Sequence, residues 1–313
     1  MSKKLEVLIE SEVGISGTMT IPDCTDEAFP AVLIISGSGK GDRDGNLKKL
    51  EMNIYKDLAD FLTGIGFVTL RYDKRGINKS GGSFLEAGIS DFIEDAAAAL
   101  RFLKSYPEVD TDRVVILGHS EGALMAPAVH VQEAAAGMIL LSGGAGPSKD
   151  FSALQSEAAF GEMDRAGGMK GWLYRKLNVT AKAKKQNEKI FRKVAESNKD
   201  VMRVQGVRIN AKWLRETLAF DTTAYLSRVK CPVLAVTGEK DVQVPPEDVK
   251  RIPELVKGEA EWRIIPGMNH ILRKYDGQHT MLGLIKEYKA QLGQPVDDEL
   301  LDVLGEWLER FKK

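Results

Sequence analysis

The sequence predicts an α/β protein with a mostly parallel, doubly wound sheet that one long insertion interrupts. Strand-like apolar runs alternate with helical segments between residues 31 and 141. This alternation stops near residue 146 and resumes at about residue 232. At its centre, the segment 118–122 (Gly-His-Ser-Glu-Gly) separates an apolar run from a helical one. Such alternation is typical of parallel strands joined by right-handed helical crossovers.

The composition limits the classes of protein to which this chain can belong. The 313 residues are 43% hydrophobic and 28% charged, as in soluble globular proteins. A net charge of −1 favours neither a nucleic-acid nor a membrane partner. Cys24 and Cys231 stand in no metal-ligand spacing, which fits a reducing compartment. No apolar signal region or bilayer-spanning stretch is present, so we expect a cytoplasmic protein.

The elements before the central motif follow from local pattern. Residues 5–10 and 15–21 read as two strands of an antiparallel hairpin. A helix is expected over residues 54–62, ended by Gly64 and Gly66. Further strands are expected over residues 31–35, 67–72 and 114–117, with a helix over 91–104. The continuous apolar character of these strands indicates burial on both faces of the sheet.

The elements after the central motif are less regular. We expect a helix to about residue 131 and a strand over residues 137–141. The sheet resumes with strands over 232–237 and 262–265, a helix over 246–256 and an amphipathic helix over 297–311. The sequence therefore divides into a core, residues 1–146 and 226–313, and an insertion, residues 147–225.

The insertion contains no convincing strand between residues 151 and 225, so we expect it to be helical. Between Arg165 and Arg215 there are 15 Lys or Arg residues and only 3 Asp or Glu residues. Such an excess usually forms a solvated helix face. The alternative is that it attracts anionic substrates such as acyl-CoA thioesters.

The segment 118–122 has the Gly-x-Ser-x-Gly pattern of a nucleophile elbow, a tight turn between a strand and a helix. Gly118 and Gly122 supply the small side chains that the turn requires, and Ser120 projects from it. The backbone N–H of Glu121, at the start of the helix, then faces the position of an oxyanion. The alternative is a glycine-rich turn with an ordinary serine.

A serine nucleophile requires a base, and the chain has four histidines. His119 belongs to the elbow and points away from Ser120, and His130 ends the next helix in a structural role. His270 follows the last strand and should lie at the carboxyl edge of the sheet, near the serine. His279 lies further into a polar segment, so His270 is the predicted base.

The base requires an orienting acid, for which Asp241 is the candidate. It leaves the strand over residues 233–237 at the same edge of the sheet. Taken alone it would be an ordinary turn residue. Nearby acids that compete with it are Glu239, Asp221 and Asp276. The chain order Ser120, Asp241, His270 is the one expected of an α/β-hydrolase triad, and this order favours Asp241.

The glycine-rich loop over residues 36–46 lacks the spacing of a phosphate-binding loop. Its glycines allow the backbone to curl, so that the N–H of Ser38 can complete an oxyanion hole. A flexible surface loop is the alternative.

Three segments together resemble the α/β-hydrolase superfamily, namely residues 36–46, 71–76 (Arg-Tyr-Asp-Lys-Arg-Gly) and 118–122. They are similar to bacterial carboxylesterases close to the dienelactone-hydrolase and prolyl-oligopeptidase-like groups. Two departures are Ala123, where relatives often have a glycine, and Lys40 in the glycine loop. The first should alter packing rather than chemistry.

The resemblance implies an α/β-hydrolase fold whose insertion is a helical cap. It also implies a serine esterase without metal or organic cofactor. Ser120 would be the nucleophile, His270 the general base and acid, and Asp241 the orienting carboxylate. Asp73 and Arg75 would brace the loops around the site through ion pairs and hydrogen bonds.

The function expected is hydrolysis of carboxylic esters with small to medium acyl groups. The alternatives on the same triad are an acyl-CoA or other thioesterase and an amidase or peptidase. A non-catalytic binding protein would lack a triad member, and none is missing from this sequence. We expect a small-molecule ester as partner, and the sequence is compatible with a homodimer.

Overall fold

The computed structural model describes residues 2–23 and 28–312, and an eight-stranded sheet forms its centre. The strand order is β1 (Lys3–Ile9), β2 (Ile15–Ile21), β4 (Val68–Tyr72), β3 (Phe29–Ile35), β5 (Val109–His119), β6 (Gly137–Leu141), β9 (Val233–Gly238), β10 (Ala260–Ile265). β2 is antiparallel to β1 and β4, and the other neighbours are parallel. The predicted mostly parallel sheet with an N-terminal hairpin is confirmed. Cys24 lies outside the described residues.

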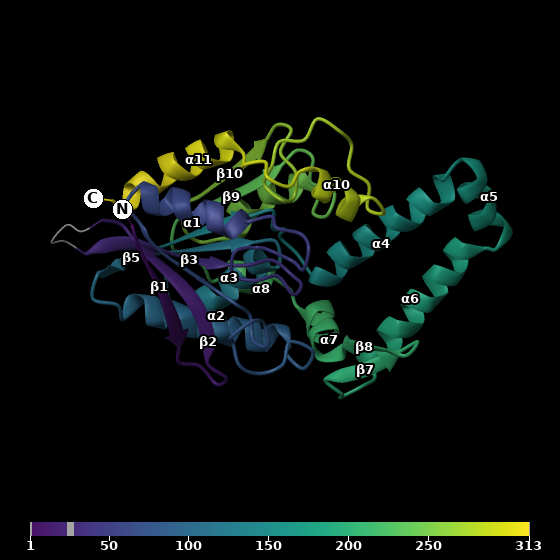
Figure 1. Ribbon diagram of the computed structural model, residues 1–313, viewed down its shortest axis with the longest axis horizontal. Helices are drawn as coiled ribbons and strands as arrows, with labels where there is room; N and C mark the ends of the chain where they lie inside the picture. Colours follow the sequence, from purple (N-terminus) through teal and green to yellow (C-terminus); the bar gives the residue numbers. More distant parts are fainter. Residues whose placement is uncertain (1, 24–27, 313) are drawn as a thin grey trace.

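Helices cover both faces of this sheet (Figure 1). One face packs against α1 (Ile54–Gly64), α10 (Leu284–Ala290) and α11 (Asp298–Leu308). The other packs against α2 (Ile89–Lys104), α3 (Glu121–Gln132), α8 (Thr223–Leu226) and α9 (Ile252–Leu255). Because both faces are covered, β3 and β5 carry the continuous apolar runs that the sequence shows.

The register of the parallel strands brings their carboxyl ends to one edge. Ile35 at the end of β3 pairs with Gly118 near the end of β5. Gly238 at the end of β9 pairs with Ile265 at the end of β10. The loops that follow these four strands therefore leave the sheet at the same edge, as expected for ligand sites in such sheets.

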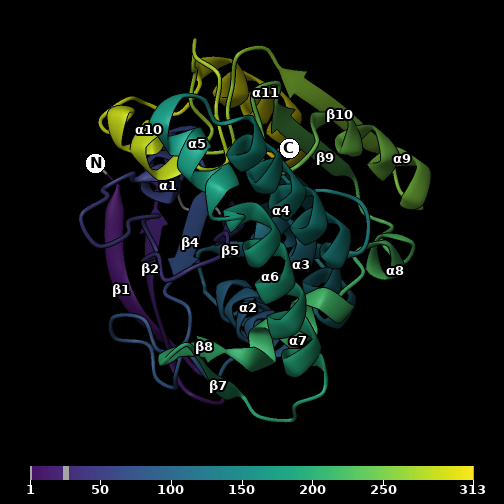
Figure 2. The same cartoon turned by 90° about the vertical axis from the view of Figure 1, so that its right-hand side faces the viewer.

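The insertion stands beside this sheet. We call α4 (Ser148–Arg165), α5 (Gly168–Lys176) and α6 (Val179–Ala195) the arm, because they project away from the sheet. At the foot of the arm lies α7 (Ala211–Ala219) (Figure 1). Viewed along the arm, α4, α6 and α7 lie in front of the sheet (Figure 2).

The expectation that the insertion contains no strand is wrong. β7 (Val201–Val204) and β8 (Val207–Asn210) form an antiparallel hairpin next to α7. Gln205 and Gly206 make its two-residue turn with φ of 52° and 82°. Positive φ at both central positions matches the right-handed twist of a hairpin, and glycine adopts it without strain. Each strand has only four residues, which is too short for a clear alternating pattern.

The helix expected over residues 246–256 is also divided. Pro246–Arg251 form a 3-10 helix, and the short α9 follows. Pro253, in the first turn of α9, has no N–H and its ring crowds the preceding turn, which favours a break between these two helices. Across the described part of the chain, none of the helices is both long enough and apolar enough to span a bilayer. The cytoplasmic location stays a prediction.

Candidate active site

Ser120 occupies the turn between β5 and α3 in a strained conformation, with φ 54° and ψ −118°. Both flanking glycines are required sterically. A Cβ on Gly118 would lie 2.3 Å from the carbonyl oxygen of Gly122, and one on Gly122 would lie 2.2 Å from that of Ile35. The Gly-x-Ser-x-Gly segment therefore forms the sharp turn that the sequence predicted, with the serine at its apex.

The structure brings Ser120, His270 and Asp241 into one hydrogen-bonded series. His270 Nε2 lies 3.0 Å from Ser120 Oγ, and His270 Nδ1 lies 2.8 Å from Asp241 Oδ2. The other carboxylate oxygen accepts from the N–H groups of Gln243 and Val244 at 2.8 and 3.0 Å. Burial opposes the charge of Asp241, but His270 and these N–H groups hold its pKa below the usual value. The Asp241 side chain is fully buried, and both of its carboxylate oxygens accept hydrogen bonds.

Two loops bring the acid and the histidine together. Asp241 stands three residues after β9, and His270 stands five residues after β10. The loops touch at Gly238, where a Cβ would lie 2.0 Å from the carbonyl oxygen of Met268. Lys240 N–H donates to the same carbonyl oxygen at 2.8 Å. The closeness of these loops explains why residues 29 positions apart meet.

The two predicted oxyanion donors lie beside Ser120. Ser38 lines the same cavity as Ser120, and a Cβ on its neighbour Gly37 would lie 3.1 Å from Ser120 Cβ. Glu121 is the first residue of α3, so its backbone N–H lies outside the hydrogen-bond ladder of the helix. The Glu121 N–H therefore lies at the positive end of the α3 dipole, and Ser38 lies in the glycine loop that lines the cavity.

His119 is a neutral imidazole that contacts both the backbone of His270 and the hydroxyl of Tyr55. Its Nε2 donates to the carbonyl oxygen of His270 at 2.8 Å, which leaves Nδ1 to accept from the hydroxyl of Tyr55 at 2.9 Å. The Tyr55 oxygen in turn accepts from Gly37 N–H at 2.7 Å. Burial, followed by the nearby His270, lowers the pKa of His119 to about 3. The sequence analysis did not single out Tyr55. Through its contact with His119, Tyr55 links the glycine loop to the loop that carries His270.

The other two histidines are engaged elsewhere. His130 Nδ1 accepts from Ala135 N–H at 3.1 Å. His279 pairs with Glu287 at 2.6 Å through Nδ1 and with the Asn269 amide at 3.1 Å through Nε2. Neither histidine contacts Ser120 in these hydrogen bonds, which agrees with the preference for His270.

The ion pairs expected around the site are present. Arg43 binds Asp73 through Nη2 at 2.7 Å, and Arg75 binds Asp95 through Nε at 2.7 Å. The side chain of Glu121, for which the sequence indicated no role, is buried and binds Lys74 Nζ at 2.7 Å. Sequence reasoning missed Lys74 because a lysine between two bracing residues carries no pattern of its own.

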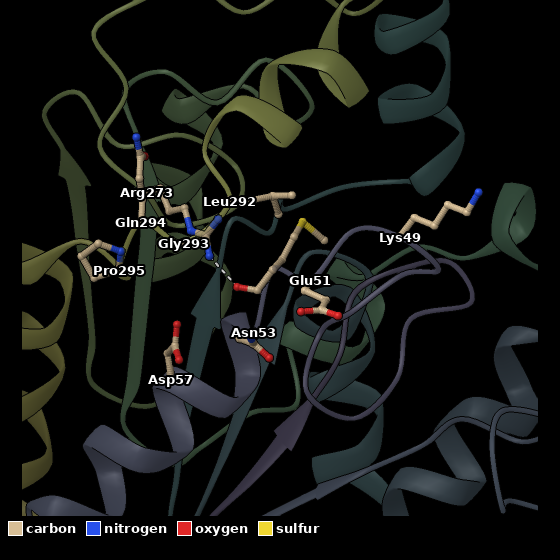
Figure 3. A pocket seen from close by; sticks show the side chains of 10 residues that line it. Lys49, Glu51, Asn53, Asp57, Arg273, Leu292, Gly293, Gln294 and Pro295 are labelled. Carbon is tan, nitrogen blue, oxygen red and sulfur yellow. Dashed lines mark hydrogen bonds between the residues drawn. The ribbon is translucent and has the colours of Figure 1, made fainter.

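The cavity above Ser120 has a volume of about 260 Å³ and contains His270 and Ser38 in its wall. The rest of its wall includes six large apolar side chains: Leu47, Leu50, Met52, Ile54, Ile271, Ile285. A larger hollow of about 620 Å³, whose wall includes Asp57 and Arg273 (Figure 3), shares Met52 with this cavity. The Met52 carbonyl oxygen accepts a hydrogen bond from Arg273. That hollow contains none of the predicted site residues, so the smaller cavity is the candidate substrate site.

No group of three or more His, Cys, Asp or Glu side chains is placed to hold a metal ion in residues 2–23 and 28–312. The expectation of a reaction without metal or organic cofactor stays a prediction. Ser120 and His270 line the cavity, and Asp241 contacts His270 on the side away from Ser120. Nucleophilic acyl transfer requires a nucleophile, a base, an orienting acid and backbone donors, and these residue types are the ones gathered here.

Comparison with known proteins places this chain among hydrolases. Residues 50–274 match the family described as "Serine aminopeptidase, S33". The esterase EstD of Thermotoga maritima is 26% identical over 297 residues, which cover 94% of this chain and 65% of EstD. This chain thus spans less than two thirds of that relative.

Solved structures share the fold. Est1E of Butyrivibrio proteoclasticus, with ferulic acid bound, aligns with a TM-score of 0.59 at 20% identity, covering 91% of this chain and 96% of that one. The esterase Pf2001 of Pyrococcus furiosus aligns with a TM-score of 0.58 at 17% identity, covering 100% and 91%. At these identities the likeness concerns the fold alone, which is that of α/β hydrolases.

Proposed function

We propose that this chain, which belongs to the serine aminopeptidase S33 family of α/β hydrolases, is a serine esterase for carboxylic esters of small to medium acyl groups. The observation that carries the proposal is the hydrogen-bonded series from Ser120 through His270 to Asp241. A serine hydroxyl is a weak nucleophile unless a base takes its proton, and the base must be held in one tautomer. The Asp241 carboxylate accepts from Nδ1 and so leaves Nε2 free to act on the serine.

The reaction follows from these positions. His270 Nε2 takes the Ser120 proton as Oγ bonds to the acyl carbon, and the carbonyl π electrons move to oxygen. The N–H groups of Ser38 and Glu121 stabilise this oxyanion. Collapse breaks the ester C–O bond, and His270 gives its proton to the leaving alcohol. Water then attacks the acyl-enzyme with His270 as base, and the carboxylic acid leaves with Ser120 restored.

The cavity favours an ester over a peptide with a free amino terminus. Binding an ammonium group in a buried site requires carboxylates, yet the cavity wall contains only one among the described residues, Asp42. Its Oδ1 already accepts from the N–H groups of Asp44 and Asn46 at 3.0 and 2.8 Å. EstD, the relative at 26% identity, is an esterase by name, which supports the same class of substrate.

We further propose that residues 147–225 act as a cap on a core of residues 1–146 and 226–313. Gln155 in α4 donates to the carbonyl oxygen of Gln243 at 2.8 Å, and Gln243 lines the substrate cavity. Glu162 in α4 accepts from Met281 N–H at 2.7 Å, in the segment that precedes α10. The insertion thus contacts one residue of the cavity wall and the segment that precedes α10.

A series of p-nitrophenyl esters from acetate through butyrate and octanoate to laurate tests the proposal. We expect kcat/KM to be highest for a short or medium chain, because an apolar cavity of about 260 Å³ accommodates a limited acyl group. Ser120→Ala should lower kcat by roughly 10⁴-fold or more. The amino-acid p-nitroanilides serve as the peptidase control. Faster cleavage of these amides than of esters, or an active Ser120→Ala variant, would contradict the proposal.

A further inference from the structure

The side chain of Glu121 is engaged on both sides, although the proposed reaction uses only its backbone. Lys74 Nζ donates to Oε2 at 2.7 Å, and the indole Nε1 of Trp213 donates to Oε1 at 2.6 Å. The Lys74 and Glu121 side chains are only 3% and 7% exposed. Trp213 belongs to α7 of the insertion. One carboxylate next to the nucleophile therefore connects a core lysine with the insertion.

Lys74 also holds the glycine loop. Its Nζ donates to the carbonyl oxygen of Gly37 at 2.7 Å and lies 5.0 Å from the centre of the Phe92 ring. A buried ammonium group requires such partners because it has lost its hydration. With Glu121, these contacts fix the ammonium group in one place, and the Gly37 carbonyl is fixed with it.

The orientation of that carbonyl determines the direction of a proposed oxyanion donor. In a trans peptide the C=O of Gly37 and the N–H of Ser38 point in opposite directions. Lys74 binds the carbonyl on one side, so the Ser38 N–H is directed to the other. The preceding peptide is held as well, because Gly37 N–H donates to the Tyr55 hydroxyl at 2.7 Å.

The helix that carries Trp213 is docked on the core by its own contacts. The Asn210 side-chain amide donates to the carbonyl oxygens of Phe84 and Ala87, each at 2.7 Å. Lys212 pairs with Asp91 at 2.7 Å at the start of α2. The indole of Trp213 therefore reaches Glu121 from a fixed base rather than from the projecting arm.

We infer that Lys74 is a positioning residue for the glycine loop, which carries the proposed oxyanion donor Ser38. Glu121 and Trp213 hold the Lys74 ammonium group in place. Docking of α7, which carries Trp213, therefore affects the turnover rate. The inference rests on the proposed esterase function and deepens it. The insertion then acts on the chemical step as well as on substrate choice. A donor aimed at the developing oxyanion lowers the energy of the transition state more than that of bound substrate, so the effect falls on kcat.

Two substitutions test the inference in the full-length protein with p-nitrophenyl butyrate. Lys74→Met removes the ammonium group but keeps most of the length, and Trp213→Phe removes the indole N–H. The matched controls are Lys40→Met, an exposed lysine of the same glycine loop, and Trp172→Phe, an exposed tryptophan of the insertion. We expect kcat to fall roughly 10- to 100-fold in Lys74→Met and roughly 3- to 10-fold in Trp213→Phe, with KM within about twofold, since loss of a whole donor costs roughly 10²- to 10³-fold. The controls should keep the kcat of the wild type.

A second readout separates positioning from a merely structural role. An alkylboronic acid forms a tetrahedral adduct on a serine and places an anionic oxygen where the oxyanion develops, whereas butyric acid resembles the bound ground state. In both variants boronate binding should weaken by the same factor as kcat/KM, and butyrate binding should not change. Equal weakening of the two ligands, or an increase in KM at constant kcat, would overturn the inference.

Loss of Lys74 leaves a buried carboxylate unpaired and can prevent folding. The double variant Lys74→Met/Glu121→Gln removes both charges and should show the same loss of kcat as Lys74→Met. A wild-type kcat in the folded double variant and in Trp213→Phe would overturn the inference while the esterase proposal stands. An inactive wild-type protein that also fails to bind the boronate would instead remove the esterase proposal itself.

Discussion

The core and the arm of this molecule use their large apolar side chains in opposite ways. In β3 and β5 the apolar side chains are buried under helices on both faces, except for the partly buried Phe29 at the start of β3. On the arm, Met169, Trp172 and Leu173 are 85%, 53% and 44% exposed. Interior packing fixes positions to fractions of an ångström, and exposed helices have no such constraint. The difference implies that the positions of side chains are more tightly constrained in the core than on the arm.

The contrast extends to polar groups. Around Ser120, the buried charges of Asp241 and Glu121 each have specific partners. In the arm, the lysines and arginines of α6 face solvent for the most part. Buried charges that lose a partner are costly, whereas exposed ones are cheap to change. Substitutions should therefore have large effects near Ser120 and small ones in the arm.

The largest effect should follow from loss of the base. His270→Gln removes the proton acceptor from Ser120, so kcat should fall by roughly 10⁴-fold or more in p-nitrophenyl butyrate hydrolysis. His279→Gln is the control, because His279 bonds Glu287 and Asn269 instead. Comparable losses in the two variants would mean that the site does not depend on His270.

Replacement of a glycine by alanine should lower the free energy of unfolding more in the core than in the insertion. In Gly122→Ala the Cβ would lie 2.2 Å from a backbone oxygen, so the turn must shift, and we expect a loss of about 1–3 kcal/mol. In Gly167→Ala, between α4 and α5, the new Cβ meets no atom within 4 Å. Its effect should stay within about 0.5 kcal/mol. Urea unfolding measures the free energy of unfolding of both variants. Equal losses would contradict the predicted difference between core and insertion.

Acid should destabilise the core through His119. Burial lowers its pKa to about 3 in the folded protein, whereas the unfolded chain titrates near 6.5. Between these values only the unfolded state binds the proton, so stability falls as the pH falls from about 6.5 toward 3. Between about pH 7 and pH 5 this amounts to about 2 kcal/mol. Urea unfolding of the wild type and of His119→Gln should differ in pH dependence by this amount; identical pH dependence would contradict the buried neutral histidine.

The smallest effect concerns the basic surface of the insertion and its alternative role in attracting acyl-CoA. If that surface attracts the anion, a rise in ionic strength from about 0.01 to 0.15 M shortens the Debye length from about 30 to 8 Å and should raise KM for an acyl-CoA a few-fold. The KM for a neutral p-nitrophenyl ester should remain nearly constant. Equal responses of the two substrates would leave the basic residues as an ordinary solvated face.

Sequence alone predicted the parts of the site that depend on local pattern and chain order. The Gly118–Gly122 turn follows from steric limits, and Asp241 and His270 follow from their places after the last strands. The structure brings these residues together with Ser120 as expected. The same reasoning predicted the sheet, because buried parallel strands carry continuous apolar runs.

What the sequence did not predict depends on contacts between distant segments. Glu121 meets Lys74 across 47 residues and Trp213 across 92, and no spacing in the chain indicates either contact. Tyr55 reaches His119 in the same way, from α1. The short hairpin β7–β8 was missed because four-residue strands give too little alternation to distinguish them from helix or loop.

The most direct measurement of the central claim is covalent labelling with a fluorophosphonate probe, followed by mass spectrometry of the digested protein. Such a probe phosphonylates a serine only when a base activates it. The account predicts one label per wild-type chain, on the peptide that contains Ser120, and no label in Ser120→Ala. Labelling of a different residue, or ester hydrolysis by a protein that takes up no label, would contradict it.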